Sequence, residues 1–147
     1  MISLLLNVIL SVVCVALYQR GKLDSSTRLL NKQQFNQDVQ QLKRLNDVVV
    51  IIDIDKFKHI NDTMGHKYGD EVIALVSKTI KNDTRSSDRA YRIGGDEFAT
   101  ITNDNSVGQR IKDDLASFDV SVSVGCGKTY EEADKAMYEN KFTDTLR

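Results

Sequence analysis

One short segment, Tyr91-Arg92-Ile93-Gly94-Gly95-Asp96-Glu97-Phe98-Ala99, places two acidic residues directly after a Gly-Gly pair. The flanking residues are rich in apolar side chains, which is typical of two strands joined by a tight turn. Glycine lets another backbone or a phosphate come close, so Gly94 and Gly95 are candidate substrate contacts. Two carboxylates at a rigid turn suit a hard cation such as Mg²⁺. An ordinary hairpin with solvated acids explains this segment equally well when it is taken alone.

A second acidic segment lies upstream, at the end of an apolar run. Val48-Val49-Val50-Ile51-Ile52 indicates a buried central strand, and Asp53-Ile54-Asp55 follows at once. Acids at the end of a buried strand are unfavourable unless they are paired or bind a metal. Because side chains alternate along a strand, Asp53 and Asp55 point to the same side. The two acidic segments could therefore share a metal pair, the arrangement used for in-line attack on a phosphate.

Together these segments resemble the GGDEF family, the diguanylate cyclases. Gly94-Gly95-Asp96-Glu97-Phe98 matches the signature of that family, and four further motifs follow the family's order. They are an imperfect opening motif at 24–35, a close match at 53–70, Ser121-Val122-Ser123-Val124-Gly125, and a segment running from Ala133-Asp134 to Met137-Tyr138 and Lys141. Five ordered motifs over most of the chain after residue 23 are far more specific than the hairpin alone.

The resemblance implies an α/β fold, the ferredoxin-like palm shared by cyclases and polymerases, with a mixed central sheet flanked by helices. It also implies an enzyme, a diguanylate cyclase that condenses two GTP molecules into cyclic di-GMP and pyrophosphate. Asp53, Asp96 and Glu97 are the expected catalytic residues. Asp53, Asp96 and the backbone carbonyl of Ile54 would bind Mg²⁺ or Mn²⁺, and Glu97 would activate or orient the attacking 3′-hydroxyl. Each domain holds one GTP, so the resemblance implies a homodimer with two domains face to face.

The resemblance also indicates where the nucleotide binds. It places Asn61 and Asp70 on guanine, whose N1–H and N2–H₂ donors suit a carboxylate and a carboxamide. A helix cap is the alternative for Asp70, because acids are favoured near the start of a helix. The remaining expected substrate contacts, at the triphosphate, are Phe57, Lys58, Arg92 and Lys141, with solvated charges as the alternative for the last two.

A regulatory motif lies just before the hairpin. Arg85-Ser86-Ser87-Asp88 resembles the family's Arg-x-x-Asp inhibitory site, at the expected spacing from Gly94. Arginine offers a planar fork for phosphate and guanine edges, and the acid would accept guanine donors. The pattern implies product inhibition by bound cyclic di-GMP. Its distance in sequence from Gly94 supports this assignment more strongly than the arginine and the acid of the motif do by themselves.

Composition limits the remaining possibilities. The chain has 147 residues, enough for one globular domain, and a net charge of −1. A chain with so little net charge has no broad basic field for duplex nucleic acid, so no nucleic-acid partner is expected. Cys14 and Cys126 lie far apart in dissimilar settings, which predicts a reduced cytosolic domain without a disulfide framework or a zinc site.

The N-terminal residues are almost wholly apolar. A membrane-spanning helix needs about 20 residues, with a lower limit near 17, so residues 2–18 are expected to cross the membrane once. Arg20 and Lys22 follow, which would leave the C-terminal side in the cytoplasm. The expectation is an inner-membrane protein with an anchor at 1–22 and a cytoplasmic GGDEF domain at 23–147. A cleaved signal peptide lacks its basic and cleavage signals here, and a helix buried by a partner or a dimer mate stays open.

Periodicity predicts the order of the elements. Helices are expected at about 31–45, 70–81, 106–118 and 131–141, and strands at 48–52, at 120–124 and on both sides of the Gly-Gly pair. A buried strand, a helix and then a hairpin fit an α/β sheet of mixed direction.

The chain departs from the family pattern near its end. After Lys141 the family continues with Gly-Arg-Asn, whose arginine touches the terminal phosphate. Here Thr145 stands where that arginine is expected, unless Arg147 substitutes. Two other functions therefore compete: an impaired domain that senses GTP or cyclic di-GMP, and a minimal cyclase making another cyclic dinucleotide. The intact acids argue against the first, and Asp70 argues against the second.

Overall fold

The computed structural model describes residues 2–42 and 46–145. Within these residues the strands form one five-stranded sheet in the order β1-β3-β4-β2-β5. The elements are α1 (Ile2–Gly21), β1 (Leu30–Asn31), α2 (Lys32–Val39), β2 (Val48–Ile54), α3 (Phe57–Met64), α4 (His66–Asp83), β3 (Arg89–Arg92), β4 (Glu97–Thr102), α5 (Val107–Ala116), β5 (Val122–Gly127) and α6 (Tyr130–Thr145).

Strand β2 is the centre of the sheet, as its unbroken β-branched run predicts. It pairs antiparallel with β4 on one side and with β5 on the other, and all seven of its residues are buried. The hairpin partners β3 and β4 are antiparallel, whereas β1 and β3 are parallel. The expected mixed sheet flanked by helices is confirmed.

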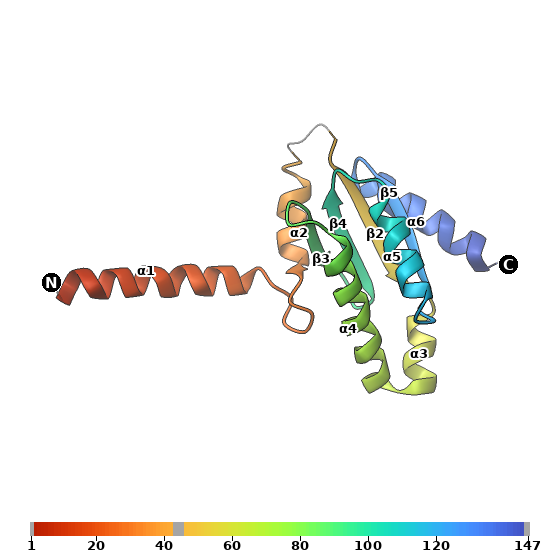
Figure 1. Ribbon diagram of the computed structural model, residues 1–147, viewed down its shortest axis with the longest axis horizontal. Helices are drawn as coiled ribbons and strands as arrows, with labels where there is room; N and C mark the ends of the chain where they lie inside the picture. The colour runs from red at the N-terminus through yellow and green to blue at the C-terminus, as the bar shows by residue number, and fades with distance from the viewer. Residues whose placement is uncertain (1, 43–45, 146–147) are drawn as a thin grey trace.

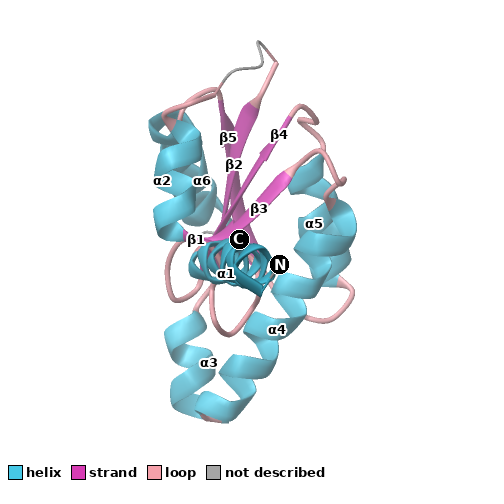
Figure 2. Ribbon diagram, turned by 90° about the vertical axis from the view of Figure 1, so that its left-hand side faces the viewer, coloured by secondary structure: helices cyan, strands magenta, loops and turns pink. Residues whose placement is uncertain are grey.

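The helices cover both faces of the sheet. Figure 2 shows α2 and α6 on one side and α4 and α5 on the other. Alternation along β2 divides the core accordingly: Val50 and Ile52 pack with residues of α4 and α5, and Val49 and Ile51 pack with residues of α2 and α6. Asp53, two positions after Ile51, therefore belongs to the face that α6 covers.

Helix α6 lies unusually close to β5, because glycine occupies the contact. A Cβ atom on Gly125 would lie 2.1 Å from both the carbonyl oxygen of Ala133 and the amide nitrogen of Met137. A Cβ on Gly127 would meet the same helix at 2.5 Å. The lack of a side chain at Gly125 and Gly127 allows the backbone of α6 to pack directly on the backbone of β5, which fixes the position of α6 on the sheet.

Several boundaries differ from the sequence-based expectation. Helix α2 ends at Val39 rather than near Leu45, which lies outside the described residues. Helix α4 begins at His66, so Gly69 lies inside it, and the break before it is Gly65 with φ of 86°. Strand β5 runs from Val122 through Gly127, because its pairing continues along β2 as far as Val49.

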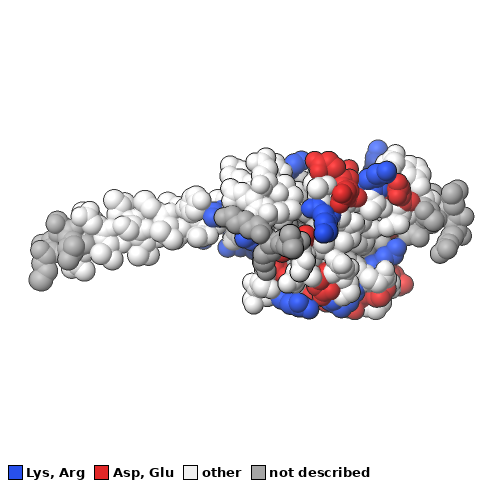
Figure 3. Space-filling view, turned by 90° about the horizontal axis from the view of Figure 1, so that it is seen from above, with Lys and Arg blue, Asp and Glu red and all other residues white. Residues whose placement is uncertain are grey.

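Helix α1 extends away from the sheet and its covering helices (Figure 1). Its apolar side chains from Leu5 to Leu17 are exposed, and the described part of this arm is white in Figure 3 up to its base, where blue basic residues begin. Arg20 lies in the last turn of the helix. Among the residues that the structure describes, no helix is both long and apolar enough to cross a membrane. The single-pass anchor expected for residues 2–18, and the inner-membrane location that depended on it, are therefore not supported.

Candidate active site at the ends of β2 and β4

The two acidic segments meet at one edge of the sheet. Asp53 at the end of β2 lies directly opposite Glu97 at the start of β4. The backbone N–H of Ile54 donates to the carbonyl oxygen of Asp96 at 3.1 Å, and the N–H groups of Ile93 and Gly94 donate to the carbonyl oxygen of Glu97. These bonds place the Gly-Gly turn beside the end of the central strand, as the sequence predicts.

The carboxylates of this edge lie in a poorly solvated, negatively charged environment. Burial raises the pKa of Asp53, and Asp96 and Asp55 raise it further, while Lys141 opposes the shift. Burial also raises the pKa of Glu97, with additional contributions from Asp53 and Asp96. Acids that repel one another at a strand end are stabilised by a cation, and Lys141 supplies one.

Lys141 reaches this edge from the last helix. Its ammonium group donates a hydrogen bond of 2.5 Å to Oδ1 of Asp53, whose side chain is 8% exposed. Burial lowers the pKa of Lys141, but the hydrogen bond and the charge of Asp53 outweigh burial and raise it. The lysine therefore stays charged at the site, in a place suited to an anionic substrate as well.

Backbone conformation does not require the glycine pair, and lack of space requires glycine only at Gly94. Neither Gly94 nor Gly95 has a positive φ. A Cβ on Gly94 would lie 2.5 Å from Oε2 of Glu97, so the carboxylate folds over this residue, whereas nothing lies within 4 Å of the equivalent position on Gly95. Gly95 thus leaves open room at the turn, and its contact with a substrate stays a prediction.

Asp55 has protein partners of its own. Its two carboxylate oxygens accept hydrogen bonds from the hydroxyl groups of Ser121 and Ser123, at 2.5 and 2.6 Å. Its backbone N–H donates to the carbonyl oxygen of Ser121. The residue that the period-two pattern placed beside Asp53 therefore secures β5 to β2. Sequence reasoning missed this contact, since 66 and 68 residues separate the partners.

The residues expected at guanine lie where α3 meets α4. Asn61 is half-buried, and a Cβ on Gly69 would be 1.9 Å from its Oδ1, so glycine makes room for this carboxamide. Asp70 follows Gly69 and is exposed. Both polar groups thus border the contact between the two helices, which form the helical hairpin at the bottom of Figure 2.

The loop expected to wrap the triphosphate has an uncommon backbone. Lys56 adopts a left-handed conformation with φ of 54°, and α3 begins immediately after it without a side-chain cap. Non-glycine residues rarely adopt this conformation, and such strain concentrates at functional sites. Uncapped N–H groups at a helix start favour anions. Phe57 packs partly into the core and Lys58 is exposed, which leaves the lysine side chain accessible.

Arg92 has a structural role that sequence reasoning missed. Its Nη2 donates to the carbonyl oxygen of Gly95 at 2.6 Å, and its Nη1 donates to the hydroxyl of Ser26 at 2.5 Å and to Asp24 at 3.4 Å. The guanidinium therefore links the opening motif to the Gly-Gly turn. Asp24 in turn accepts from the amide and hydroxyl of Thr27. A phosphate contact for Arg92 stays a prediction.

The Arg-x-x-Asp motif that is expected to be inhibitory forms the turn between α4 and β3. The backbone N–H of Arg85 donates to Oδ2 of Asp88 at 2.9 Å, and the N–H of Asp88 donates to the carbonyl oxygen of Arg85. The Arg85 guanidinium lies 3.3 Å from the carboxylate of Asp104, a residue that sequence reasoning did not select. The acid and the arginine of the motif are thus close together, and each already has a partner.

The donor set at the end of β2 suits a divalent cation, although it is incomplete. Among the described residues, no group of three or more His, Cys, Asp or Glu side chains is placed to hold a metal. The expected set is two carboxylates, Asp53 and Asp96, with the carbonyl of Ile54. Mg²⁺ commonly uses one or two carboxylates and takes its other ligands from phosphates and water. The ammonium of Lys141 is already paired with Asp53, so this carboxylate has one cationic partner within the chain.

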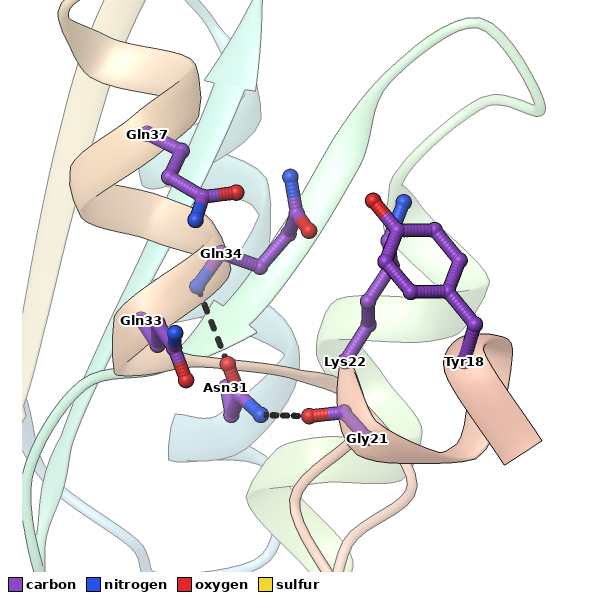
Figure 4. Close-up of a pocket in the computed structure, with 7 residues that line it drawn as sticks. All are labelled: Tyr18, Gly21, Lys22, Asn31, Gln33, Gln34 and Gln37. Carbon is purple, nitrogen blue, oxygen red and sulfur yellow. Dashed lines mark hydrogen bonds between the residues drawn. The ribbon is translucent and has the colours of Figure 1, made fainter. Parts of the chain in front are cut away.

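Two pockets flank the domain face that carries α2. One of about 230 Å³ lies between the end of α1 and α2, where Asn31 accepts from the N–H of Gln34 and donates to the carbonyl of Gly21 (Figure 4). Its seven lining residues include none of the predicted site residues. The other, of about 300 Å³, is lined by Glu97 with Phe35 and residues of α2 and α6.

Comparisons with known proteins agree with this geometry. The family described as diguanylate cyclase, GGDEF domain, matches residues 21–125. The chain is 30% identical over 143 residues to the probable diguanylate cyclase DgcI of Escherichia coli K12. This match covers 86% of the chain and 32% of that protein. It is 33% identical to the diguanylate cyclase DgcS of Shewanella oneidensis, over 80% of the chain and 49% of that protein. The chain thus spans a third to a half of the length of these relatives.

A solved structure shows the same fold. The coiled coil and GGDEF domain of DgcB from Caulobacter crescentus, in complex with c-di-GMP, superposes with a TM-score of 0.83 and 24% identity. The structural match covers 96% of this chain and 91% of that one.

The family match over residues 21–125 shows that the chain belongs to the GGDEF domain family, the family of the diguanylate cyclases.

Proposed function

We propose that this chain is a diguanylate cyclase domain that condenses two GTP molecules into cyclic di-GMP and two pyrophosphates. The observation that carries the proposal is the pairing of Asp53 with Glu97 beside the Gly-Gly turn, with Lys141 on the same edge. This edge offers carboxylates for a divalent metal, a lysine for phosphate and an acid with a raised pKa for proton transfer.

The residues of this edge have separate tasks. Asp53, Asp96 and the carbonyl of Ile54 hold Mg²⁺ or Mn²⁺, which supplies charge neutralisation at the reacting phosphate when it is bound. Lys141, already charged and directed at this edge, binds the triphosphate. The exposed Lys58 and the uncapped start of α3 bind the same anionic group.

The chemical step joins two nucleotides held by two domains. The 3′-hydroxyl of one GTP attacks the α-phosphate of the other, the bond from this phosphorus to the bridging oxygen of pyrophosphate breaks, and pyrophosphate leaves. Glu97 accepts the hydroxyl proton, a task that its raised pKa favours. Repeating the step with the roles exchanged closes the ring. Because one domain binds one GTP, the active form is a face-to-face homodimer.

Base selection depends on Asn61 and Asp70. The half-buried carboxamide at the α3–α4 contact reaches the sugar-facing edge of guanine, and the exposed carboxylate accepts its N1–H and N2–H₂ donors. Adenine lacks these donors, so the pair selects GTP. Product inhibition through Arg85 and Asp88 completes the proposal, with cyclic di-GMP bound at the turn before β3.

The test uses the full chain with Mg²⁺ and labelled GTP or ATP, with products separated by chromatography. We expect cyclic di-GMP from GTP alone, and its loss in Asp53→Asn. The matched control is Asp113→Asn, which removes the same charge from an exposed position on α5. A product containing adenine would contradict the roles of Asn61 and Asp70. Equal activity in Asp53→Asn and the unmodified chain would contradict the active site.

An impaired, sensing domain is the second candidate. The specific observation that favours it is the sequence after Lys141, where Thr145 stands in place of the family's arginine. Binding of cyclic di-GMP without any turnover of GTP would establish this function in place of the first.

A further inference from the structure

Asp104 is held rigidly in the loop between β4 and α5. Its Oδ1 accepts hydrogen bonds from the amide and the hydroxyl of Ser106, at 2.9 and 2.6 Å. Its own N–H donates to the hydroxyl of Thr102 at 3.0 Å. The position of this carboxylate is therefore fixed from both sides of the loop.

The second oxygen of Asp104 is shared by two arginines. Oδ2 lies 3.3 Å from Nη2 of Arg85 and 2.9 Å from Nη1 of Arg110. The hydrogen bonds from Ser106 and from Arg110 hold the pKa of Asp104 below its usual value, so it is ionised at neutral pH. Arg85, the arginine of the inhibitory motif, is thus already paired with an anion of the same chain.

The pairing joins an exposed side chain to a largely enclosed one. The side chain of Arg85 is 62% exposed, whereas that of Asp104 is 14% exposed. An arginine recognises phosphate through the planar fork of its guanidinium, and a carboxylate uses the same donors. Asp104 contacts Nη2 of this guanidinium, so a ligand phosphate that binds through Nη2 must displace the carboxylate.

We propose that Asp104 competes with the phosphate of cyclic di-GMP for the guanidinium of Arg85 and so weakens the inhibitory site. This proposal rests on the inhibitory site included in the proposed function. Arg110 moderates the competition: it donates to the carbonyl of Asp83 at 3.0 Å as well as to Asp104, and so draws part of the carboxylate's charge away from Arg85.

The test measures the affinity of the full chain for cyclic di-GMP by titration calorimetry, without GTP. Asp104→Asn keeps an oxygen for the Ser106 cap but replaces the shared oxygen with an amide group that accepts no hydrogen bond. Because an exposed ion pair is weak, affinity should rise by only about 1.5- to 5-fold. Asp113→Asn is the matched control, since its carboxylate is exposed on α5 and accepts from Gln109.

Arg110→Gln tests the direction of the effect. Without Arg110, the carboxylate of Asp104 pairs with Arg85 alone and competes more strongly for its guanidinium. Affinity for cyclic di-GMP should therefore fall. In the Asp104→Asn background the same change should have no effect, because there is no carboxylate left to release. An equal loss of affinity in both backgrounds would show that Arg110 acts on the ligand directly, and would overturn its assigned role.

The outcomes separate this inference from the site on which it rests. Binding that Arg85→Ala abolishes, and that Asp104→Asn strengthens while Asp113→Asn does not, would support the competition. Unchanged or weaker binding in Asp104→Asn, with Arg85 still required, would overturn the competition and keep the inhibitory site. Binding that Arg85→Ala leaves unchanged, or none in either the unmodified chain or Asp104→Asn, would overturn the inhibitory site and the competition together.

Discussion

The ammonium group of Lys141 donates a hydrogen bond to the carboxylate of Asp53, although 88 residues separate them in the sequence. The contact joins the last helix to the end of the central strand, on the face of the sheet that α6 covers. It places a fixed positive charge among Asp53, Asp55 and Asp96, all of which act on the pKa of this lysine.

Replacing Lys141 by Gln should lower kcat/KM for GTP about 10- to 100-fold, since a hydrogen bond to a charged group contributes about 1.5–3 kcal/mol. The effect should be mainly on KM, because the proposed task of this lysine is to bind phosphate rather than to transfer a proton. Steady-state kinetics with Mg²⁺ would measure it. Lys135→Gln, on the same helix but 79% exposed and paired with Glu139, is the control. Unchanged KM in Lys141→Gln would refute the assignment.

Replacing Arg92 by Lys should lower the free energy of unfolding by about 1–2 kcal/mol, because a lysine cannot bond Ser26 and the Gly95 carbonyl at once. Urea denaturation at neutral pH would measure the loss, with the exposed Arg28→Lys as the control. A raised KM for GTP with unchanged stability would instead indicate that Arg92 serves the substrate rather than the turn.

The carboxylate of Asp24 should make stability depend on acidity. Burial alone would raise its pKa, but hydrogen bonds from Thr27 and Ser26 and the charge of Arg92 lower it from 3.8 to about 2. A carboxyl whose pKa is lower in the folded than in the unfolded chain stabilises the fold fully when the pH is above its unfolded-state pKa. This stabilisation is lost as the pH falls through its folded-state pKa.

Asp24→Asn should therefore be less stable than the unmodified chain at pH 7, and the difference should shrink between about pH 4 and pH 2. Denaturation curves for both forms at several pH values would measure this. A difference that stays constant over that interval would show that the charge of Asp24 is not the cause.

Replacing Gly69 by Ala should weaken GTP binding without unfolding the protein. The new Cβ would displace the Asn61 carboxamide, while alanine favours the helical conformation by up to about 1 kcal/mol. We expect KM for GTP to rise about tenfold, the equivalent of 1.4 kcal/mol, with the thermal midpoint nearly unchanged. Gly21→Ala, where nothing lies within 4 Å of the added atom, is the control. Normal KM in Gly69→Ala would argue against Asn61 at guanine.

Much of the fold could be predicted because its signals are local. The apolar run of β2, the glycine pair before β4 and the apolar spacing in α4 and α5 each determine their own element. The boundaries of β5 and α2 were less predictable. Strand β5 extends to Gly127 through pairing with Val49, which a sequence window around either residue does not contain.

The site shows the same division. The proximity of Asp53 and Glu97 could be predicted from the sequence, because Asp53 ends a recognisable strand and Glu97 lies in a known family signature. Their partners could not, because Asp55 with Ser123 and Arg92 with Ser26 are contacts between segments 66 to 68 residues apart. Asp104 gave no signal at all, because a single acid after a strand resembles any loop residue.

The glycine contact between β5 and α6 limits which changes in the sequence of α6 keep Lys141 in place. Because Ala133 and Met137 are held against Gly125, the four residues that follow Met137, ending at Lys141, set the distance from this contact to Asp53. One residue inserted there would advance the ammonium group by about 1.5 Å and swing it around the helix axis by about 100°. Substitutions on the outer side of α6 leave this spacing intact, whereas adding or removing a residue between Met137 and Lys141 would separate the lysine from Asp53.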